Sequence, residues 1–443
     1  MNKSKTTIFT LFTLAFISPA LSQEKWDLEK CISHAIENNL SIKQQEATKD
    51  QSDVELNTAK WSRLPNLSGS ASHSFNFGRS LQANNTYQSL NTQNTSFGLN
   101  TSIPLFTGMQ IPNNIALAKL NLKAAIEDLN KAKEDISIQV AQAYLQVLFN
   151  EELAGVAHAQ VDLSQEMLMQ KEEYFKNGKA SEAEWYEAKA RVAQDQLSAV
   201  QADNNLKLAL LDLSQLLELP SPDNFGIVSP DINLDKYFDK ISSPSEIYNE
   251  AILSKPSIKA AQYRLEGAEK SVKIAKSAYY PQLSFGAGIN TNYYNVSGKV
   301  NNGFGVQLKD NFSQYLGFQL SIPLFNRFST RNQVRSAKIR KITLNWQLEE
   351  SKKTLYKEIQ QAYYNAVGAE SRFESSVTAD KAAEASFNLM KEKYSEGKAN
   401  ATEYNESRTA WMKAVSEKIQ AKYDYIFRTK ILDFYRGVPL SLK

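Results

Sequence analysis

The sequence is poor in the residues and motifs that catalysis and metal binding usually require. Cys31 is the only cysteine in 443 residues, so an intramolecular disulfide is excluded. The residues before it, Leu28-Glu29-Lys30, do not form a lipobox, so we expect no lipid attachment. We expect Cys31 to be a half-buried residue of a helix. The three histidines are scattered, and His-Glu-x-x-His, cysteine-pair and glycine-rich phosphate motifs are missing. We therefore expect no enzyme, no bound metal and no cofactor.

Long hydrophobic runs are also missing after the first 22 residues. Lys3 and Lys5 precede an apolar run at 8–17 and a small-residue site at 20–22, a pattern typical of a signal peptide (1–22) cleaved before Gln23. No later run approaches the roughly 18 apolar residues of a membrane-spanning helix. The net charge is +3, and removing the two leader lysines leaves about +1, which gives no case for nucleic acid.

Proline and glycine are absent from two long stretches, which indicates helix because proline breaks helices and glycine weakens them. Residues 113–219 have no proline and two glycines, and residues 324–438 have no proline and three glycines. We expect a bend at Gly178 in the first stretch and at Gly397 in the second. The predicted helices lie at about 109–176, 180–218, 328–395 and 399–435.

These stretches belong to two copies of one unit, and such internal repetition decides the architecture. Ser102-Ile103-Pro104-Leu105-Phe106 recurs unchanged at 321–325, and Gly178-Lys179-Ala180 recurs as Gly397-Lys398-Ala399. The repeats are predicted at 23–220 and 244–443. A linker at 221–243, marked by prolines, joins them.

Between the prolines of each unit, the apolar residues recur with a period of two. Phe97, Leu99 and Ile103 alternate with polar or small residues, which indicates strands with one apolar and one polar face. A soluble hairpin packed on the helices is the alternative reading. The predicted strands lie at about 66–78, 95–106, 282–293 and 313–325, and the segments at 78–93 and 295–311 are expected to be exposed loops.

Four strands cannot close a barrel with a lumen, whereas three chains supply twelve, an even number in the range of outer-membrane barrels. The expected fold is therefore mainly α with a small transmembrane β portion.

The chain resembles the TolC family of outer-membrane efflux proteins over essentially its whole mature length. The signs are the repeat order, the strand-to-helix steps at Pro104 and Pro323, and the paired tips at 174–178 and 393–397. The resemblance implies a homotrimer in the outer membrane, in which a 12-stranded β-barrel continues into an α-helical tunnel in the periplasm. It also implies a belt formed by the linker and the C-terminal tail. The implied partners are outer-membrane lipid, a periplasmic adaptor and an inner-membrane pump of RND or ABC type.

The same resemblance places acidic residues around the periplasmic entrance, at Glu184, Glu187, Glu403 and Glu406. Three copies would array these carboxylates around one constriction, which favours cations. Capping of the returning helices is an equally good reading of Glu184 and Glu403. Glu187 and Glu406 lie deeper and are the better selectivity candidates.

Tyr394 matches a family tyrosine that holds the entrance shut, but its expected basic partner is Ala399 here. Lys398 or Lys179 is a substitute, or else these lysines only cover helix ends. The adaptor-facing turns are predicted at two sets of residues: Asn177, Gly178, Lys179, Glu396, Gly397 and Lys398.

Two other classes of protein are alternatives to an outer-membrane channel. A secreted coiled-coil scaffold without a pore explains the signal peptide and the sevenfold spacing of Ile115, Leu122, Leu129 and Ile136 in the first long helix. It does not explain paired strands at matching places in both repeats. A periplasmic solute-binding protein needs compact α/β lobes, which are missing.

Overall fold

The computed structural model describes residues 24–81, 85–222, 225–230 and 242–442 of the chain. The expected signal peptide and much of the expected linker lie outside the described residues. None of the helices in the described part combines the length and hydropathy needed to cross a membrane.

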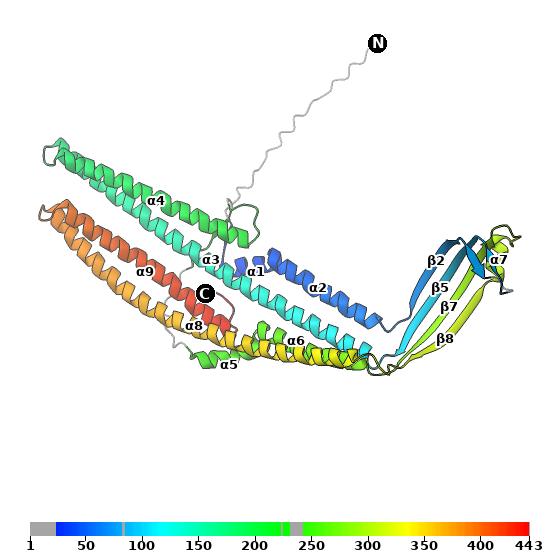
Figure 1. Cartoon of the computed structure of the whole chain (residues 1–443). Helices are drawn as coiled ribbons and strands as arrows, with labels where there is room; N and C mark the ends of the chain where they lie inside the picture. The colour runs from blue at the N-terminus through cyan, green and yellow to red at the C-terminus, as the bar shows by residue number, and fades with distance from the viewer. Residues whose placement is uncertain (1–23, 82–84, 223–224, 231–241, 443) are drawn as a thin grey trace, which may run out of the picture.

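Two helical hairpins of equal dimensions dominate the structure. The long helices α3 (Gln110–Lys176) and α8 (Ser329–Ser395) have 67 residues each, roughly 100 Å at about 1.5 Å per residue. The returning helices α4 (Glu182–Leu216) and α9 (Ala401–Tyr435) have 35 residues each. Figure 1 shows the hairpins side by side with both tips at the same end. The returning helices therefore cover only the tip half of each long helix.

The other half is covered by the helices that precede the strands. In the first repeat these are α1 (Leu28–Asn38) and α2 (Leu40–Trp61), and in the second α5 (Pro244–Ser254) and α6 (Pro256–Ser277). Helix α2 packs on α3, and α6 packs on both α3 and α8. Between the tips and the sheet, the chain is thus a row of helices in the order α2, α3, α6, α8.

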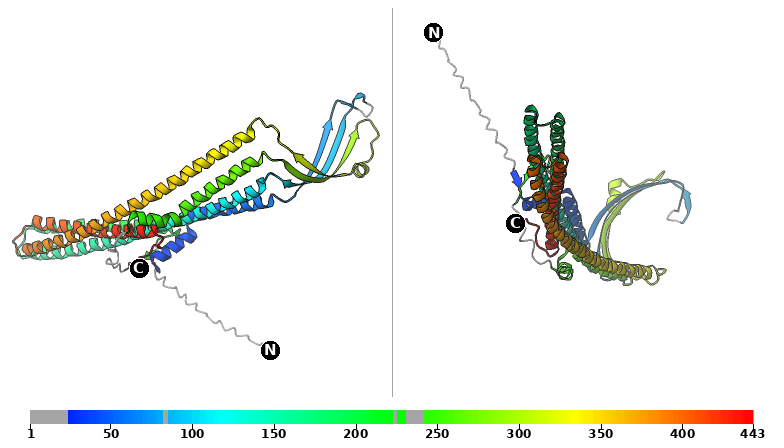
Figure 2. Two further views of the ribbon diagram at one scale, coloured as in Figure 1. Left: turned by 90° about the horizontal axis from the view of Figure 1, so that it is seen from below. Right: turned by 90° about the vertical axis from the view of Figure 1, so that its left-hand side faces the viewer.

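The strands form one antiparallel sheet at the end opposite the tips. Strands β2 (Asn66–Asn76), β5 (Thr92–Phe106), β7 (Gln282–Val296) and β8 (Ser313–Ser321) lie in the order β2-β5-β7-β8. The pairing of β5 with β7 joins the two repeats. Figure 2 shows the sheet curled into an open trough. The mainly helical, twice-repeated fold with a small sheet is confirmed.

The expected strand 313–325 is too long, because β8 ends at Ser321. Pro323 has no N–H to donate, and the chain leaves the sheet before it. Pro104 stays inside β5, where the pairing with β7 shifts register between Pro104 and Phe106. It is tolerated there because the pairing of β5 with β2 already ends at Ser102.

The segments expected as loops also contain regular structure. A short hairpin, β3 (Arg79–Leu81) with β4 (Tyr87–Ser89), extends the first, and β7 runs into the second as far as Val296. The second also holds the helix α7 (Phe304–Asp310). Gln307 fixes α7 against β7, since its side chain accepts a bond from the N–H of Tyr294 and donates one to that residue's carbonyl.

The largest core cluster lies at mid-length, where α1, α3 and α4 meet. Strand β1 (Glu24–Trp26) pairs in parallel with β6 (Phe225–Ile227), and the Tyr144 hydroxyl donates 2.6 Å to the carbonyl oxygen of Val228. Leu440 and Leu442 of the C-terminal tail are buried in the same cluster. The tail and the described part of the linker therefore pack against the first repeat.

Each long helix starts from a left-handed turn just after the proline step. Met109 has φ 66° before α3, and Phe328 has φ 61° before α8. Gly108 has φ 59°, and a Cβ there would lie 2.7 Å from the carbonyl oxygen of Ser277. This close approach requires glycine at position 108 and fixes the sheet relative to α6.

Candidate functional site

The tips of the two hairpins close in the same way. Gly178 has φ 71° and Gly397 has φ 73°, both in the left-handed region that favours glycine. The N–H of Lys179 donates 2.7 Å to the carbonyl of Tyr174, and that of Lys398 donates 2.8 Å to the carbonyl of Lys393. The predicted turn residues thus occupy two exposed tips.

Glu184 and Glu403 are both capping residues. The Ser181 hydroxyl accepts a bond from the N–H of Glu184, whose carboxylate accepts one of 2.8 Å from the N–H of Ser181. Asn400 and Glu403 form the same reciprocal box at the start of α9. Within one chain, Glu184 and Glu403 therefore make the contacts of helix-capping residues.

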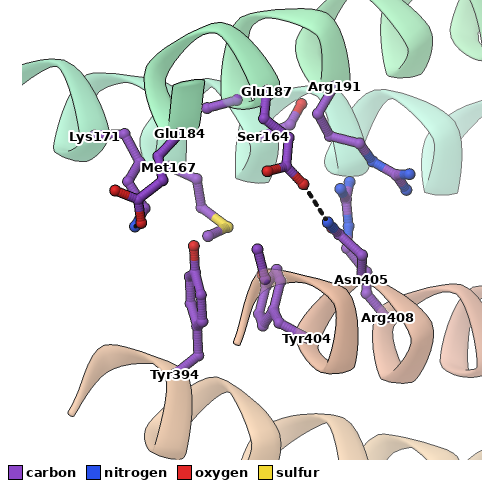
Figure 3. A pocket seen from close by; sticks show the side chains of 12 residues that line it. Ser164, Met167, Lys171, Glu184, Glu187, Arg191, Tyr394, Tyr404, Asn405 and Arg408 are labelled. Atoms are coloured by element: carbon purple, nitrogen blue, oxygen red, sulfur yellow. Dashed lines mark hydrogen bonds and ion pairs between the residues drawn. The ribbon is translucent and has the colours of Figure 1, made fainter. Parts of the chain in front are cut away.

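Glu184 also contacts Lys171, and Lys171 lies against Tyr394 of the other hairpin. The Lys171 ammonium is 3.3 Å from a Glu184 carboxylate oxygen and 4.9 Å from the centre of the Tyr394 ring. Figure 3 shows the three side chains grouped between the hairpins. Burial by itself lowers the pKa of Lys171, but the contacts with Tyr394 and Glu184 outweigh it and the net pKa is raised.

The pKa of Glu184 is held below its ordinary value, mainly by the backbone hydrogen bond from Ser181 and further by Lys171. The carboxylate therefore stays charged at neutral pH and keeps its attraction for the lysine.

The basic residue that contacts Tyr394 within one chain is Lys171, which the sequence analysis did not suggest. Lys398 pairs instead with Glu396 of its own turn at 2.6 Å, while the cation over Tyr394 is Lys171. Lys171 lies seven residues before Gly178 and Glu184 lies six residues after it, so the hairpin turn brings them close together. The spacing around the predicted turn was therefore a signal in the sequence for this pair.

A pocket between the hairpins contains three of the predicted residues, Glu184, Glu187 and Tyr394, and has an empty volume of about 470 Å³, part of it open to solvent. The Glu187 carboxylate accepts a 3.5 Å bond from the Asn405 amide, which Figure 3 marks. Glu403 and Glu406 are exposed on α9 and do not line this pocket. One chain therefore brings together only part of the predicted acidic set.

Tyr404 is a site residue that sequence reasoning missed. It is 2% exposed and stacks on Tyr394 with ring centres 4.9 Å apart. Its hydroxyl has no hydrogen-bond partner among the described residues, and burial raises its pKa. The two stacked tyrosines form the apolar wall of the pocket.

Arg408 was also missed, and it joins the two repeats. Its side chain is 1% exposed and donates 2.6 Å to Asp195 of α4 and 2.8 Å to the Gln160 amide oxygen of α3. Arg191 lies 3.4 Å from the same aspartate. An arginine one turn after Tyr404 on α9 was visible in the sequence, but its partners lie more than 200 positions away.

These contacts hold the two hairpins together near their tips. All of these links are non-covalent, and the outermost, Lys171 with Glu184, is partly exposed, so it is individually weak. No group of histidine, cysteine and acidic residues in the described part of the chain is placed to hold a metal ion.

Comparison with known proteins identifies the family. The model of the outer membrane efflux protein family matches residues 31–218 and 247–433. The outer membrane protein TolC of Escherichia coli K12 is 23% identical over 92% of this chain and 81% of its own length. The cation efflux system protein CusC of Escherichia coli O157:H7 is 24% identical over 75% of this chain and 68% of its own.

Solved structures show the same fold. The Campylobacter jejuni CmeC outer membrane channel superimposes with a TM-score of 0.75 over 93% of this chain and 86% of its own, at 20% identity. The sequence match covers both repeats, and the structural match covers sheet and hairpins alike. The chain therefore belongs to the outer membrane efflux protein family and resides in the outer membrane.

Proposed function

We propose that three copies of this chain form the exit duct of a tripartite efflux or type I secretion system. The duct conducts its cargo passively from the periplasm to the outside. The observation that carries the proposal is the sheet: it is curved, has two chemically different faces, and ends in two strands, β2 and β8, each paired on one side only within the described residues.

Such edge strands carry unpaired backbone groups and are templates for pairing with another chain. If β8 of one copy pairs with β2 of the next, three copies close a ring of twelve strands. Closure also buries backbone groups that lipid cannot satisfy. The exposed leucine and phenylalanine side chains of β8, Leu316 at 77% and Phe318 at 71%, then face lipid.

The helices beside these edges support the same pairing. Helix α8 follows β8, and α2 precedes β2, so they become neighbours when the strands pair. No acidic residue occurs from 311 to 348, whereas this stretch contains six arginine and lysine residues. Opposite them, α2 carries Asp50, Asp53 and Glu55 within six positions. The charges of the two edges are complementary.

In this assembly the hairpin tips form the periplasmic entrance. Lys171, Glu184 and Tyr394 hold each pair of hairpins together, and Glu187 and Glu406 supply negative charge near the opening. The exposed turns at 177–179 and 396–398 face a periplasmic adaptor and, beyond it, an inner-membrane pump of RND or ABC type. The linker and C-terminal tail form the belt at mid-length.

Two measurements test the duct. Detergent-extracted protein should migrate as a trimer on an unheated gel and as a monomer after heating. The trimer inserted into planar bilayers should conduct. A scaffold without a pore, the second candidate, gives no current; a stable monomer would also refute the duct.

A further inference from the structure

The strand register defines one polar face of the sheet across all four strands. Ser68 lies opposite Asn100, Asn100 opposite Gly288, and Gly288 opposite Tyr315. The neighbouring row on the same face is Ser70, Gly98, Asn290 and Ser313. Because side chains alternate between faces, these two rows share one side.

The opposite face is mainly apolar. The row between the two polar ones is Gly69, Leu99, Ile289 and Gln314, and the adjacent row is Leu67, Thr101, Ala287 and Leu316. Placing the apolar face towards lipid puts the serine and asparagine face on the inside of the proposed ring.

The polar face has an unusual composition for a water-filled wall. Within the four strands, all in the described part of the chain, no aspartate, glutamate, lysine or arginine occurs. The one histidine of these strands, His73, lies on the other face, opposite Thr95. The wall is therefore made of hydroxyl, amide and glycine.

Some of these polar groups bond to one another across the strands. The Tyr315 hydroxyl donates 3.1 Å to the Asn100 amide oxygen, and its ring covers Gly288, where a Cβ would lie 2.7 Å from the ring edge. Ser72 and Ser96 share a hydrogen bond of 2.7 Å. Gly98 likewise leaves room for the Asn290 amide, because a Cβ there would lie 2.7 Å from its oxygen.

We infer that the strand-lined part of the duct is an electrically neutral, hydrogen-bonding wall that does not sort its cargo by charge. The inference rests on the proposed duct. Charge selection is confined to the helical part, where the acidic entrance residues lie. The exit accepts cations, anions and uncharged hydroxylated solutes alike, and size is the limit there.

A cysteine probe measures the local potential. In the purified trimer, Asn290→Cys is reacted with a cationic and an anionic methanethiosulfonate reagent, and the ratio of the two rates is compared with that of a small free thiol. Cys31 is fully buried, so the unmodified chain is the blank. We expect the two ratios to agree within about twofold, because a neutral wall concentrates neither reagent.

Two matched positions complete the experiment. Ile289→Cys, the adjacent residue on the apolar face, should react about tenfold more slowly or less, since lipid or detergent covers that face. Thr402→Cys, beside Glu403 and Glu406, should favour the cationic reagent several-fold.

Equal reactivity at positions 289 and 290 would refute the assignment of faces. A tenfold preference for either reagent at position 290, relative to the free thiol, would refute the neutral wall while leaving the duct intact. Failure to obtain a trimer at all would instead refute the proposed duct, and the neutral wall with it.

Discussion

The guanidinium of Arg408 on α9 donates a hydrogen bond of 2.6 Å to Asp195 on α4, and the arginine side chain is 1% exposed. These residues are 213 positions apart and belong to different repeats. The pair fixes how the two hairpins sit together behind the tip pocket, because a buried charge tolerates little displacement from its partner.

Replacing Arg408 by leucine should destabilise the tip half of the hairpins by up to about 3–5 kcal/mol, because the buried Asp195 loses its nearer partner and keeps only Arg191 at 3.4 Å. Limited proteolysis of the purified trimer should show earlier cleavage in α9 or α4. The double replacement Arg408→Leu with Asp195→Leu should recover most of the resistance. If Arg408→Leu alone resisted proteolysis as well as the unmodified chain, the pair would not contribute to stability.

Removing the charge of Lys171 should loosen the entrance. In Lys171→Met, the contacts with Glu184 and Tyr394 are lost while the side chain keeps its length. We expect single-channel conductance in planar bilayers to rise several-fold as the hairpins separate more easily. Lys398→Met is the matched control, because Lys398 pairs with Glu396 of its own turn. A larger effect from Lys398 than from Lys171 would reverse this assignment.

Neutralising Glu187 and Glu406 should reduce cation preference. Replacing both by glutamine keeps the size and hydrogen bonding of the side chains but removes up to six negative charges per trimer. The cation preference should fall in proportion to the share of the entrance potential that these charges supply. The reversal potential in a salt gradient measures the change. The capping pair Glu184 and Glu403 stays intact, so the returning helices still start correctly. An unchanged reversal potential would exclude Glu187 and Glu406 from the constriction.

Charge reversal should test how neighbouring copies meet. Arg335→Glu or Asp53→Lys alone should lower the fraction of trimer on an unheated gel, since each places like charges across the α8–α2 junction. The combined variant should recover part of that loss, because opposite charges face each other again. Lys413→Glu, on exposed α9 surface away from the junction, is the control. Full trimer in both single variants would mean that the edge charges do not guide assembly.

Acid should weaken the link between Lys171 and Glu184. The pKa of Glu184 is depressed in the folded chain, so its stabilising contribution is present above the ordinary carboxyl pKa of about 4.3 and is lost as pH falls through the depressed value. Conductance should therefore rise only below about pH 4.3. Glu184→Gln should already be open at neutral pH and lack this acid response.

Local patterns predicted most of the architecture. The scarcity of proline and glycine indicated four helices, and the structure ends the long ones at Lys176 and Ser395, beside the predicted glycine turns. Alternation of apolar and polar residues predicted the strands, because side-chain period is a property of a few consecutive residues. The capping glutamates were equally visible, since a capping box spans four positions.

Other features depended on packing between distant segments. The sequence alone could not choose Lys171 as the partner of Tyr394, identify Arg408 as buried, or fold α7 against β7, because each depends on the register in which two surfaces meet. Strands β1 and β6 are three residues long and exist only because they pair with each other. The sequence by itself determined the lengths and periods of the elements; the tertiary structure decided which side chains face one another across them.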